Sequence, residues 1–322
     1  MKIFFIPILI SGFVFFYFYS SSTKNVHFTI GVTQWISNAE FEKNILGFKN
    51  ALHSKGFIEG QNLQVIRKNP NGDQAQQNEI IKDFINKPVN LIYSLTTPGT
   101  IIASQNTKKI PIVFSIVTYP QAVGLVDSLK NSKNNLTGTR NHVSFAKQFY
   151  IFESIYPKLK TIVFAHRFSE PNSIIQFQEA QALLKQRDIK LIDLAALSLK
   201  DLKNKLLKLG PVDAIYSACD TLIASGGEEL VIDYSLKRKL PNFTCNKGGI
   251  KKGALVGNVA DFETIGYLSG LKAADILNGA EPDWIETQSM SLDYIGVNLK
   301  TAKLIGANIP KDLLYKSKLV VQ

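Results

Sequence analysis

Cysteine, histidine and arginine are scarce in this chain of 322 residues, which holds only 2 cysteines and 4 histidines. Neither Cys219 nor Cys245 stands in a Cys-x-x-Cys or Cys/His spacing. Two cysteines exclude a disulfide-rich scaffold, and so few thiol and imidazole groups leave a structural zinc site almost without ligands. We expect no metal and no cofactor. The apolar fraction of 45% is sufficient for ordinary cores, and the length suits two domains of about 150 residues each.

The positive charge is carried mainly by lysine. The 37 basic and 26 acidic residues give a formal charge of +11, but only 5 of the basic residues are arginines. Arginine is the side chain that binds phosphates and guanine bases in a bidentate manner, whereas the lysines here are scattered along the whole chain. We therefore expect no nucleic-acid partner. The charge would favour contact with anionic lipid headgroups if the chain were attached to a membrane.

The common signatures of enzymes are also missing. The sequence contains no Gly-x-Ser-x-Gly, Gly-x-x-x-x-Gly-Lys-Ser/Thr or His-Glu-x-x-His motif. His166, beside Arg167 and Glu170, is the one candidate for acid–base chemistry, and a single loop histidine is more often simply solvated. Cys219 is a poor nucleophile because the neighbouring Asp220 disfavours its thiolate. We expect a protein that binds a ligand without catalysing a reaction.

The first residues have the composition of an export signal. Lys2 precedes an uncharged run from Ile3 to Tyr19, and the small residues Ser20 and Ser22 suit a cleavage site after Ser22. The run nearly reaches the length of about 18 residues that spans a bilayer, so residues 1–23 are either a signal peptide or an uncleaved membrane anchor. No cysteine lies near the end of this run, which excludes a lipoprotein. We expect an exported protein, in the periplasm or at the outer face of the cytoplasmic membrane.

Past this segment, the patterns of strand and helix alternate. The first series of expected elements is 28–32, 41–55, 63–67, 74–86, 90–93, 98–107 and 112–115, followed by a less regular stretch over 123–139. The second series is 161–165, 173–186, 190–193, 199–208, 214–216, 222–235 and 242–244. Such alternation predicts right-handed βαβ crossovers and parallel sheets that are covered on both faces. The expected fold class is α/β, with two doubly wound parallel-sheet lobes that face each other.

The loops after the strands supply the candidate binding residues. In open α/β sheets a ligand lies beyond the carboxyl ends of the strands, so here it would be held between the lobes. Thr97 and Ser173 begin helices whose N-termini attract a carboxylate, while Asp220 and Asp261 would supply the opposite charge. The complement of such a site is a small zwitterion. These four side chains also suit a capping role, and the sequence leaves that alternative open. Other residues that follow strands are Gln34, Trp35 and Asn246.

Several motifs resemble those of the exported substrate-binding proteins of ATP-binding-cassette (ABC) importers. They are Gly47-Phe48 to Gly60-Gln61-Asn62, Gly72-Asp73-Gln74, Ile112 to Thr118, Gly124-Leu125-Val126, Asn135 to Gly138, Val297 to Ala302 and Ile309-Pro310. The branch that they resemble includes binders of tryptophan and other aromatic amino acids. The resemblance runs from about Phe28 to the C-terminus.

This resemblance implies a periplasmic-binding-protein fold, type I-like, with several hinge crossings. The first lobe would comprise residues 26–137 and 262–289, and the second lobe residues 138–259 and 290–322. By position in the family's pattern, the binding residues would be Thr96, Thr97, Ser115, Thr118, Asn172, Ser173, Asp220 and Asp261. The chain departs from the pattern at Cys245-Asn246, where relatives usually have Ser-Asp. Tyr119 and Trp35 are candidates to stack on an aromatic ligand.

The implied function is that of an extracytoplasmic receptor. It would bind a small zwitterionic solute, with an amino acid and in particular an aromatic one as the candidate, and deliver it as a monomer to an ABC permease and its ATPase subunit. The alternative is a membrane-tethered sensing module that signals through a partner, since one fold serves both roles. Cys219 and Cys245 follow consecutive strands, and whether they pair depends on a distance that the sequence leaves open.

Overall fold

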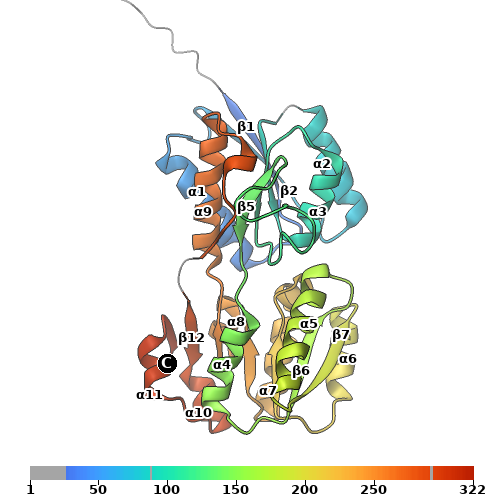
Figure 1. Cartoon of the computed structure of the whole chain (residues 1–322), viewed down its shortest axis with the longest axis vertical. Coiled ribbons are helices and arrows are strands. Elements are labelled where there is room, and N and C mark those ends of the chain that lie inside the picture. Colours follow the sequence, from blue (N-terminus) through green and yellow to red (C-terminus); the bar gives the residue numbers. More distant parts are fainter. Residues whose placement is uncertain (1–26, 88, 291–292) are drawn as a thin grey trace, which may run out of the picture.

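The computed structural model describes residues 27–87, 89–290 and 293–322, and it shows two α/β lobes stacked along the long axis of the molecule (Figure 1). The predicted fold class is confirmed. The signal peptide or anchor expected at residues 1–23 lies outside the described residues. In the part of the chain that the structure describes, no helix has the length and apolar character that a membrane span requires.

The first lobe is built on a six-stranded sheet that is parallel throughout. Its strands in spatial order are β11 (Gln288–Ser289), β5 (Leu136–Arg140), β4 (Ile112–Ser115), β3 (Leu91–Leu95), β1 (Phe28–Thr33) and β2 (Leu63–Lys68). Its helices are α1 (Ala39–Ser54), α2 (Gln74–Asn86), α3 (Thr97–Asn106), the 3-10 helix η2 (Pro282–Trp284) and α9 (Phe262–Leu277). Successive strand side chains point to opposite faces. Leu91 and Tyr93 therefore pack against α1 and α9, while Ile92 packs against α2 and α3.

Two glycines allow α1 and α9 to pack in close contact, although the helices lie far apart in the sequence. A Cβ on Gly47 would lie 2.1 Å from the carbonyl oxygen of Glu263, and one on Gly266 would lie 1.9 Å from that of Asn44. Any larger residue would force the helices apart, so glycine is required for this packing. The contact brings Phe41 and Phe262, near the start of the two helices, to a ring-centroid distance of 5.8 Å.

The second lobe is built on a seven-stranded sheet in which β10 and β12 are antiparallel and the other pairs are parallel. Its strands in spatial order are β13 (Leu319–Val321), β12 (Ile295–Asn298), β10 (Val256–Asn258), β9 (Asn242–Thr244), β8 (Ala214–Ser217), β6 (Thr161–Arg167) and β7 (Lys190–Ala196). Its helices are α4 (Phe145–Ile155), α5 (Pro171–Gln186), α6 (Leu199–Leu207), the π-helical turn η1 (Ile223–Gly227), α7 (Glu228–Lys237), α8 (Lys247–Lys252), α10 (Leu299–Ile305) and α11 (Lys311–Lys316).

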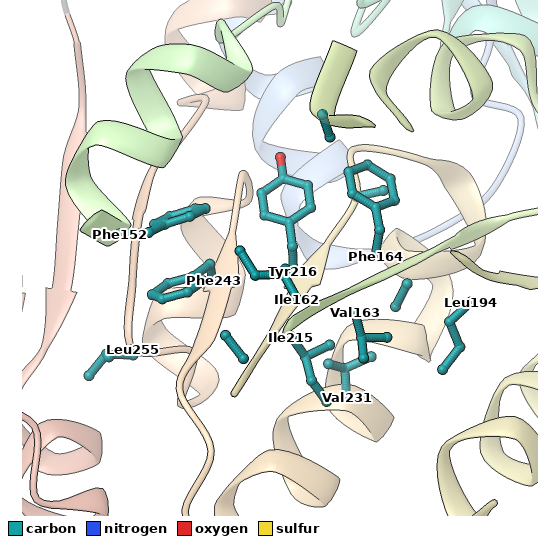
Figure 2. Packing of buried hydrophobic residues seen from close by; sticks show 14 of the residues in the cluster. Phe152, Ile162, Val163, Phe164, Leu194, Ile215, Tyr216, Val231, Phe243 and Leu255 are labelled. Atoms are coloured by element: carbon teal, nitrogen blue, oxygen red, sulfur yellow. The ribbon is translucent and has the colours of Figure 1, made fainter. Parts of the chain in front are cut away.

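Figure 2 shows how the core of the second lobe is divided by its sheet. Phe152 of α4 stacks on Phe243 of β9 with ring centroids 3.7 Å apart, beside Tyr216 of β8. Ile215, the neighbour of Tyr216 in β8, points to the opposite face, where Val231 of α7 lies. Both faces of the sheet are thus buried, which fixes the strand ends from which the binding loops emerge.

The chain passes between the lobes three times, from β5 to α4, from β10 to α9 and from β11 to β12 (Figure 1). Among the elements that the structure describes, these crossings are the covalent links between two separately packed cores. Each lobe can therefore move as a body about the crossings, which is the arrangement that allows hinge closure.

The structure corrects the sequence prediction at β5 and η1. β5 lies partly inside the stretch 123–139 that the sequence predicts to be irregular, because β5 has no apolar run and is held by pairing with β4. A Cβ on Gly138 would lie 2.2 Å from the carbonyl oxygen of Phe114, so this pairing depends on glycine. The single helix predicted over 222–235 is interrupted, since Gly226 has a φ of +121° inside η1.

Candidate ligand-binding site

A cavity lies between the lobes and is lined by residues from the loops that follow strands of both sheets. Five of the residues predicted from the sequence line it: Thr96, Thr97, Asn172, Asp220 and Asn246. The other lining residues are Phe41, Ile116, Asn141, Glu170, Cys219, Thr221, Ala224 and Phe262. Both lobes contribute, so the site is complete only when the lobes are brought together.

Two threonine hydroxyls of the first lobe are buried in the cavity wall. Thr96 and Thr97 are 3% and 1% exposed, and neither Oγ1 atom has a hydrogen-bond partner among the described residues. Thr96 follows β3 with a φ of +73°, which is unusual for a β-branched residue, and Thr97 is the first residue of α3. The N-terminus of a helix carries partial positive charge and free N–H groups. The two threonine hydroxyls and the N-terminus of α3 together suit the binding of an anion such as a carboxylate.

Two buried carboxylates form the opposite wall. The N–H and hydroxyl of Thr221 donate to Glu170, whereas the N–H groups of Arg167 and Ile223 donate to Asp220 at 2.7 and 2.9 Å. Burial raises the pKa of both carboxyl groups, and the nearby charge of Asp220 raises the pKa of Glu170 further. A cationic group bound between the lobes would relieve this repulsion and stabilise the ionised pair.

Asn172 adds a further polar group to the second-lobe wall. Its Nδ2 donates to the carbonyl oxygen of Cys219 at 2.9 Å, while its Oδ1 is buried and has no partner within the described residues. A free amide oxygen accepts hydrogen bonds, so this group is available to a donor bound in the cavity.

A disulfide holds the second-lobe wall together. Cys219 and Cys245 pair with a Cα–Cα distance of 5.9 Å, which settles the question that the sequence left open. The bond joins the loops that follow β8 and β9, and the next residue in each loop, Asp220 or Asn246, lines the cavity. The disulfide therefore fixes the separation of two predicted binding residues.

Six predicted site residues lie outside the lining of this cavity, namely Gln34, Ser115, Thr118, Tyr119, Ser173 and Asp261. Three of them form hydrogen bonds inside their own lobes. Gln34 Nε2 donates to Glu42 at 2.9 Å, Ser115 Oγ accepts from Asn44 at 2.9 Å, and the Ser173 hydroxyl donates to a backbone carbonyl at 2.7 Å. The sequence prediction assigned these three side chains to the ligand, but in the structure they form hydrogen bonds with residues of their own lobe.

The side chains of Thr118 and Asp261 contact other residues near the crossings between the lobes. The Thr118 hydroxyl donates to Oδ1 of Asn141 at 3.0 Å, so it positions a residue that does line the cavity. Asp261 caps α9 and forms an ion pair with Lys247. The capping alternative that the sequence left open is therefore observed for Asp261, while the Asp220 carboxylate accepts from the N–H of Ile223, three residues further along the chain.

The two aromatic candidates lie at the contact between the lobes. The Tyr119 hydroxyl, in the first lobe, donates to Glu179 of α5 in the second lobe at 2.6 Å. Trp35 is 4% exposed and lines a neighbouring cavity with residues of both lobes, including Pro98 and Arg167. Tyr119 thus joins the lobes directly.

His166 is buried, which corrects the expectation of a solvated loop histidine. It is 3% exposed because β6 extends beyond the predicted end to Arg167 and places the imidazole on a covered face of the sheet. Its Nε2 lies 2.9 Å from Asp193 Oδ1, and its ring stacks on Phe177. Within the described ranges, no three His, Cys, Asp or Glu side chains are grouped as metal ligands would be.

The sequence prediction did not single out three important lining residues: Phe41, Glu170 and Phe262. Glu170 lies in the predicted loop after a strand, residues 167–173, but the sequence prediction gave it an individual role only as a neighbour of His166. Phe41 and Phe262 lie in the first turns of α1 and α9, and an apolar residue there has the same sequence signal as a core residue.

The sequence model of the family described as "ABC transporter substrate binding protein" matches residues 29–321. The chain belongs to this family. The family is a class of solute-binding proteins rather than of enzymes. This substrate-binding protein is 28% identical to the "Tyrosine-binding protein" of Clostridioides difficile (strain R20291) over 277 residues, which cover 86% of this chain and 80% of that protein.

Two solved structures indicate how its lobes are arranged. The ABC domain in complex with L-Trp from Streptococcus pneumonia has a TM-score of 0.87 at 25% identity and covers 92% of this chain and 100% of that chain. The ligand-free, open structure of a substrate binding protein with adhesive properties from Clostridium difficile has a TM-score of 0.71 at 28% identity, covering 91% and 99%. The TM-score is higher with the L-Trp complex than with the ligand-free, open structure, although the sequence identity is lower.

Proposed function

We propose that this substrate-binding protein binds a free amino acid between its lobes. One observation supports the proposal above the others: the cavity has hydroxyls and a helix N-terminus on one side and two buried carboxylates on the other. The α-carboxylate would accept hydrogen bonds from Thr96, Thr97 and the start of α3. The α-ammonium would donate to Glu170 and Asp220, and each such charge-assisted bond contributes about 1.5–3 kcal/mol.

The protein would act as the receptor of an ABC importer. Substrate-binding proteins bind small solutes and work with permease components, and this one would be exported and function as a monomer outside the cytoplasmic membrane, free or anchored through residues 1–23. The moving parts would be the two lobes expected from the sequence, residues 26–137 with 262–289 and residues 138–259 with 290–322. Closure on the amino acid would present a defined surface to the permease and its ATPase subunit.

Calorimetric titration and thermal unfolding with the twenty common amino acids test this proposal. A ligand at a hundred times its Kd adds about 2.7 kcal/mol of stability, which is a rise of several degrees in Tm for a chain of this size. The N-acetyl and the carboxamide derivative of the best ligand each remove one charge, and we expect both to bind at least about tenfold more weakly. Equal binding of the N-acetyl derivative would refute a role for Glu170 and Asp220.

Thr97→Val tests the carboxylate side of the site. The Thr97 hydroxyl has no partner in the described part of the chain, so its removal should leave the Tm unchanged or raise it slightly. Ligand affinity should fall about 10- to 150-fold if the hydroxyl binds a carboxylate. Thr264→Val, the same change at an exposed position of α9, is the control and should alter neither quantity.

A further inference from the structure

A second cavity lies beside the candidate binding site, at the contact between the lobes. Ala224, Asn246 and Phe262 line both cavities, so the two cavities are neighbours that share these residues. A ligand whose charged groups lie between Thr97 and Glu170 would direct its side chain past Phe262 toward the second cavity. This step rests on the proposed function.

The near part of the second cavity has an apolar wall. Phe262, Ala224 and Ala260 line it, and Phe41 packs against the ring of Phe262 at 5.8 Å. Small alanine side chains beside an aromatic ring leave a flat apolar surface, which suits an aromatic ring of the ligand. The size and shape of this wall thus favour a ligand with a planar apolar body.

The carboxylate of Glu228, the first residue of α7, also lines the second cavity, beside the shared residue Asn246. Glu228 is 4% exposed, and burial raises the pKa of its carboxyl group to about 7. Its Oε1 accepts hydrogen bonds from the hydroxyl of Thr244 and from Asn246 Nδ2, whereas Oε2 has no hydrogen-bond partner within the described residues. A Cβ on Gly249 would lie 2.2 Å from Oε1, so the glycine makes room for the carboxyl group.

The other charges around the second cavity are already paired. Lys247 pairs with Asp261, Lys252 with Glu229, and Glu40 with Lys43. The two lysines would repel a cationic ligand tip, and the carboxylates of Glu40 and Glu228 would repel an anionic tip. A neutral hydrogen-bond donor meets neither penalty, and it satisfies the free oxygen of Glu228.

We propose that Glu228 determines specificity by accepting a hydrogen bond from a neutral O–H or N–H donor at the far end of the ligand's aromatic side chain. Tyrosine and tryptophan carry such a donor on the ring, and phenylalanine does not. A hydrogen bond to a charged acceptor contributes about 1.5–3 kcal/mol, so at pH 8 or above, where the Glu228 carboxyl is mostly ionised, tyrosine or tryptophan should bind about 10- to 150-fold more tightly than phenylalanine.

Calorimetric titration of the whole protein with tyrosine, tryptophan, phenylalanine and 4-methoxyphenylalanine tests the proposal without any mutation. We expect one of the two donors to bind at least tenfold more tightly than phenylalanine, and the methoxy compound, which cannot donate, to lose that advantage. Phenylalanine binding as tightly as both donors would overturn the role of Glu228 and leave the amino-acid receptor standing. No binding of any amino acid would overturn both proposals.

Glu228→Gln then assigns the preference to this side chain. Glutamine keeps an oxygen for the Thr244 hydroxyl but presents an NH₂ group in place of the free oxygen. The variant should bind the preferred donor at least tenfold more weakly while its Kd for phenylalanine changes less than threefold. Glu263→Gln, the same change at an exposed position of α9, is the matched control. A Glu228→Gln protein that keeps the full preference would refute the assignment.

Discussion

Replacing Glu170 by glutamine should move stability and ligand affinity in opposite directions. Glu170 is buried beside Asp220, and its raised pKa means that ionising it in the folded protein costs free energy. Each pK unit of that rise corresponds to about 1.4 kcal/mol at a pH where the unfolded chain is ionised. Glutamine has nearly the same shape and an amide oxygen that can accept from Thr221, but it carries no charge. We therefore expect the ligand-free variant to be more stable than the wild type at pH 8, by about 1.4 kcal/mol or more.

The same change removes one of the two groups that would bind the ligand's ammonium. A charge-assisted hydrogen bond of about 1.5–3 kcal/mol corresponds to a loss of affinity of about 10- to 150-fold. Urea unfolding and calorimetric titration at pH 8 measure the two quantities on one preparation. At pH 4.5 the wild-type carboxyl is protonated in the folded state, so the difference in stability should largely disappear.

Glu263→Gln, an exposed change in the first turn of α9, controls for the loss of one charge anywhere on the protein. This variant should have nearly the same free energy of unfolding as the wild type, and its Kd for the ligand should lie within a factor of two of the wild-type value. A Glu170→Gln variant that is less stable than the wild type at pH 8, or that binds the ligand unchanged, would refute the reasoning that this carboxylate is held ionised for a cationic group.

Three further outcomes are expected. The pKa of Glu228 rises from 4.5 to about 7 on folding, so this carboxyl should contribute about 3 kcal/mol of stability that is complete below pH 4.5 and lost as the pH rises through 7. Glu228→Gln should flatten this part of a Tm-versus-pH curve, and an unchanged slope would contradict the assignment. The Cys219–Cys245 bond closes a loop of 26 residues, so its reduction should lower the free energy of unfolding by about 3.5 kcal/mol. A Cys219→Ser/Cys245→Ser variant should show the same fall in Tm, and adding reductant should not change the Tm of that variant. Tyr119→Phe removes a hydrogen bond between the lobes and should weaken ligand binding by about 1 kcal/mol while increasing the ligand-free radius of gyration in X-ray scattering; identical scattering from both proteins would show that this bond does not hold the lobes closed.

The sequence alone determined the parts of this protein that depend on local patterns. The helix over Gln74–Asn86 and the strands Ile112–Ser115 and Asn242–Thr244 were predicted with the bounds that the structure shows. Periodic apolar residues, capping residues and glycine stops act over a few neighbours, so they are readable without the fold. Their alternation was sufficient to predict two parallel-sheet lobes, and ordered motifs were sufficient to indicate the family.

Tertiary structure decided which residues face the ligand cavity. Ser115 and Ile116 are adjacent at the end of β4, yet Ser115 bonds to Asn44 inside the lobe while Ile116, with a φ of +57°, lines the cavity. A single residue's rotation of the backbone reverses the direction of a side chain at a strand end, and the sequence pattern does not record that rotation.

The pairing of distant groups was likewise decided only by the fold. Cys219 meets Cys245 because two neighbouring strands end at the same edge of the sheet, and Glu170 meets Asp220 for the same reason. Phe41 approaches Phe262 because glycines let α1 and α9 pack closely across more than half of the chain. Local propensity places each residue at an element's end, but only the packing of the elements sets the distances and burial from which the binding chemistry of this site follows.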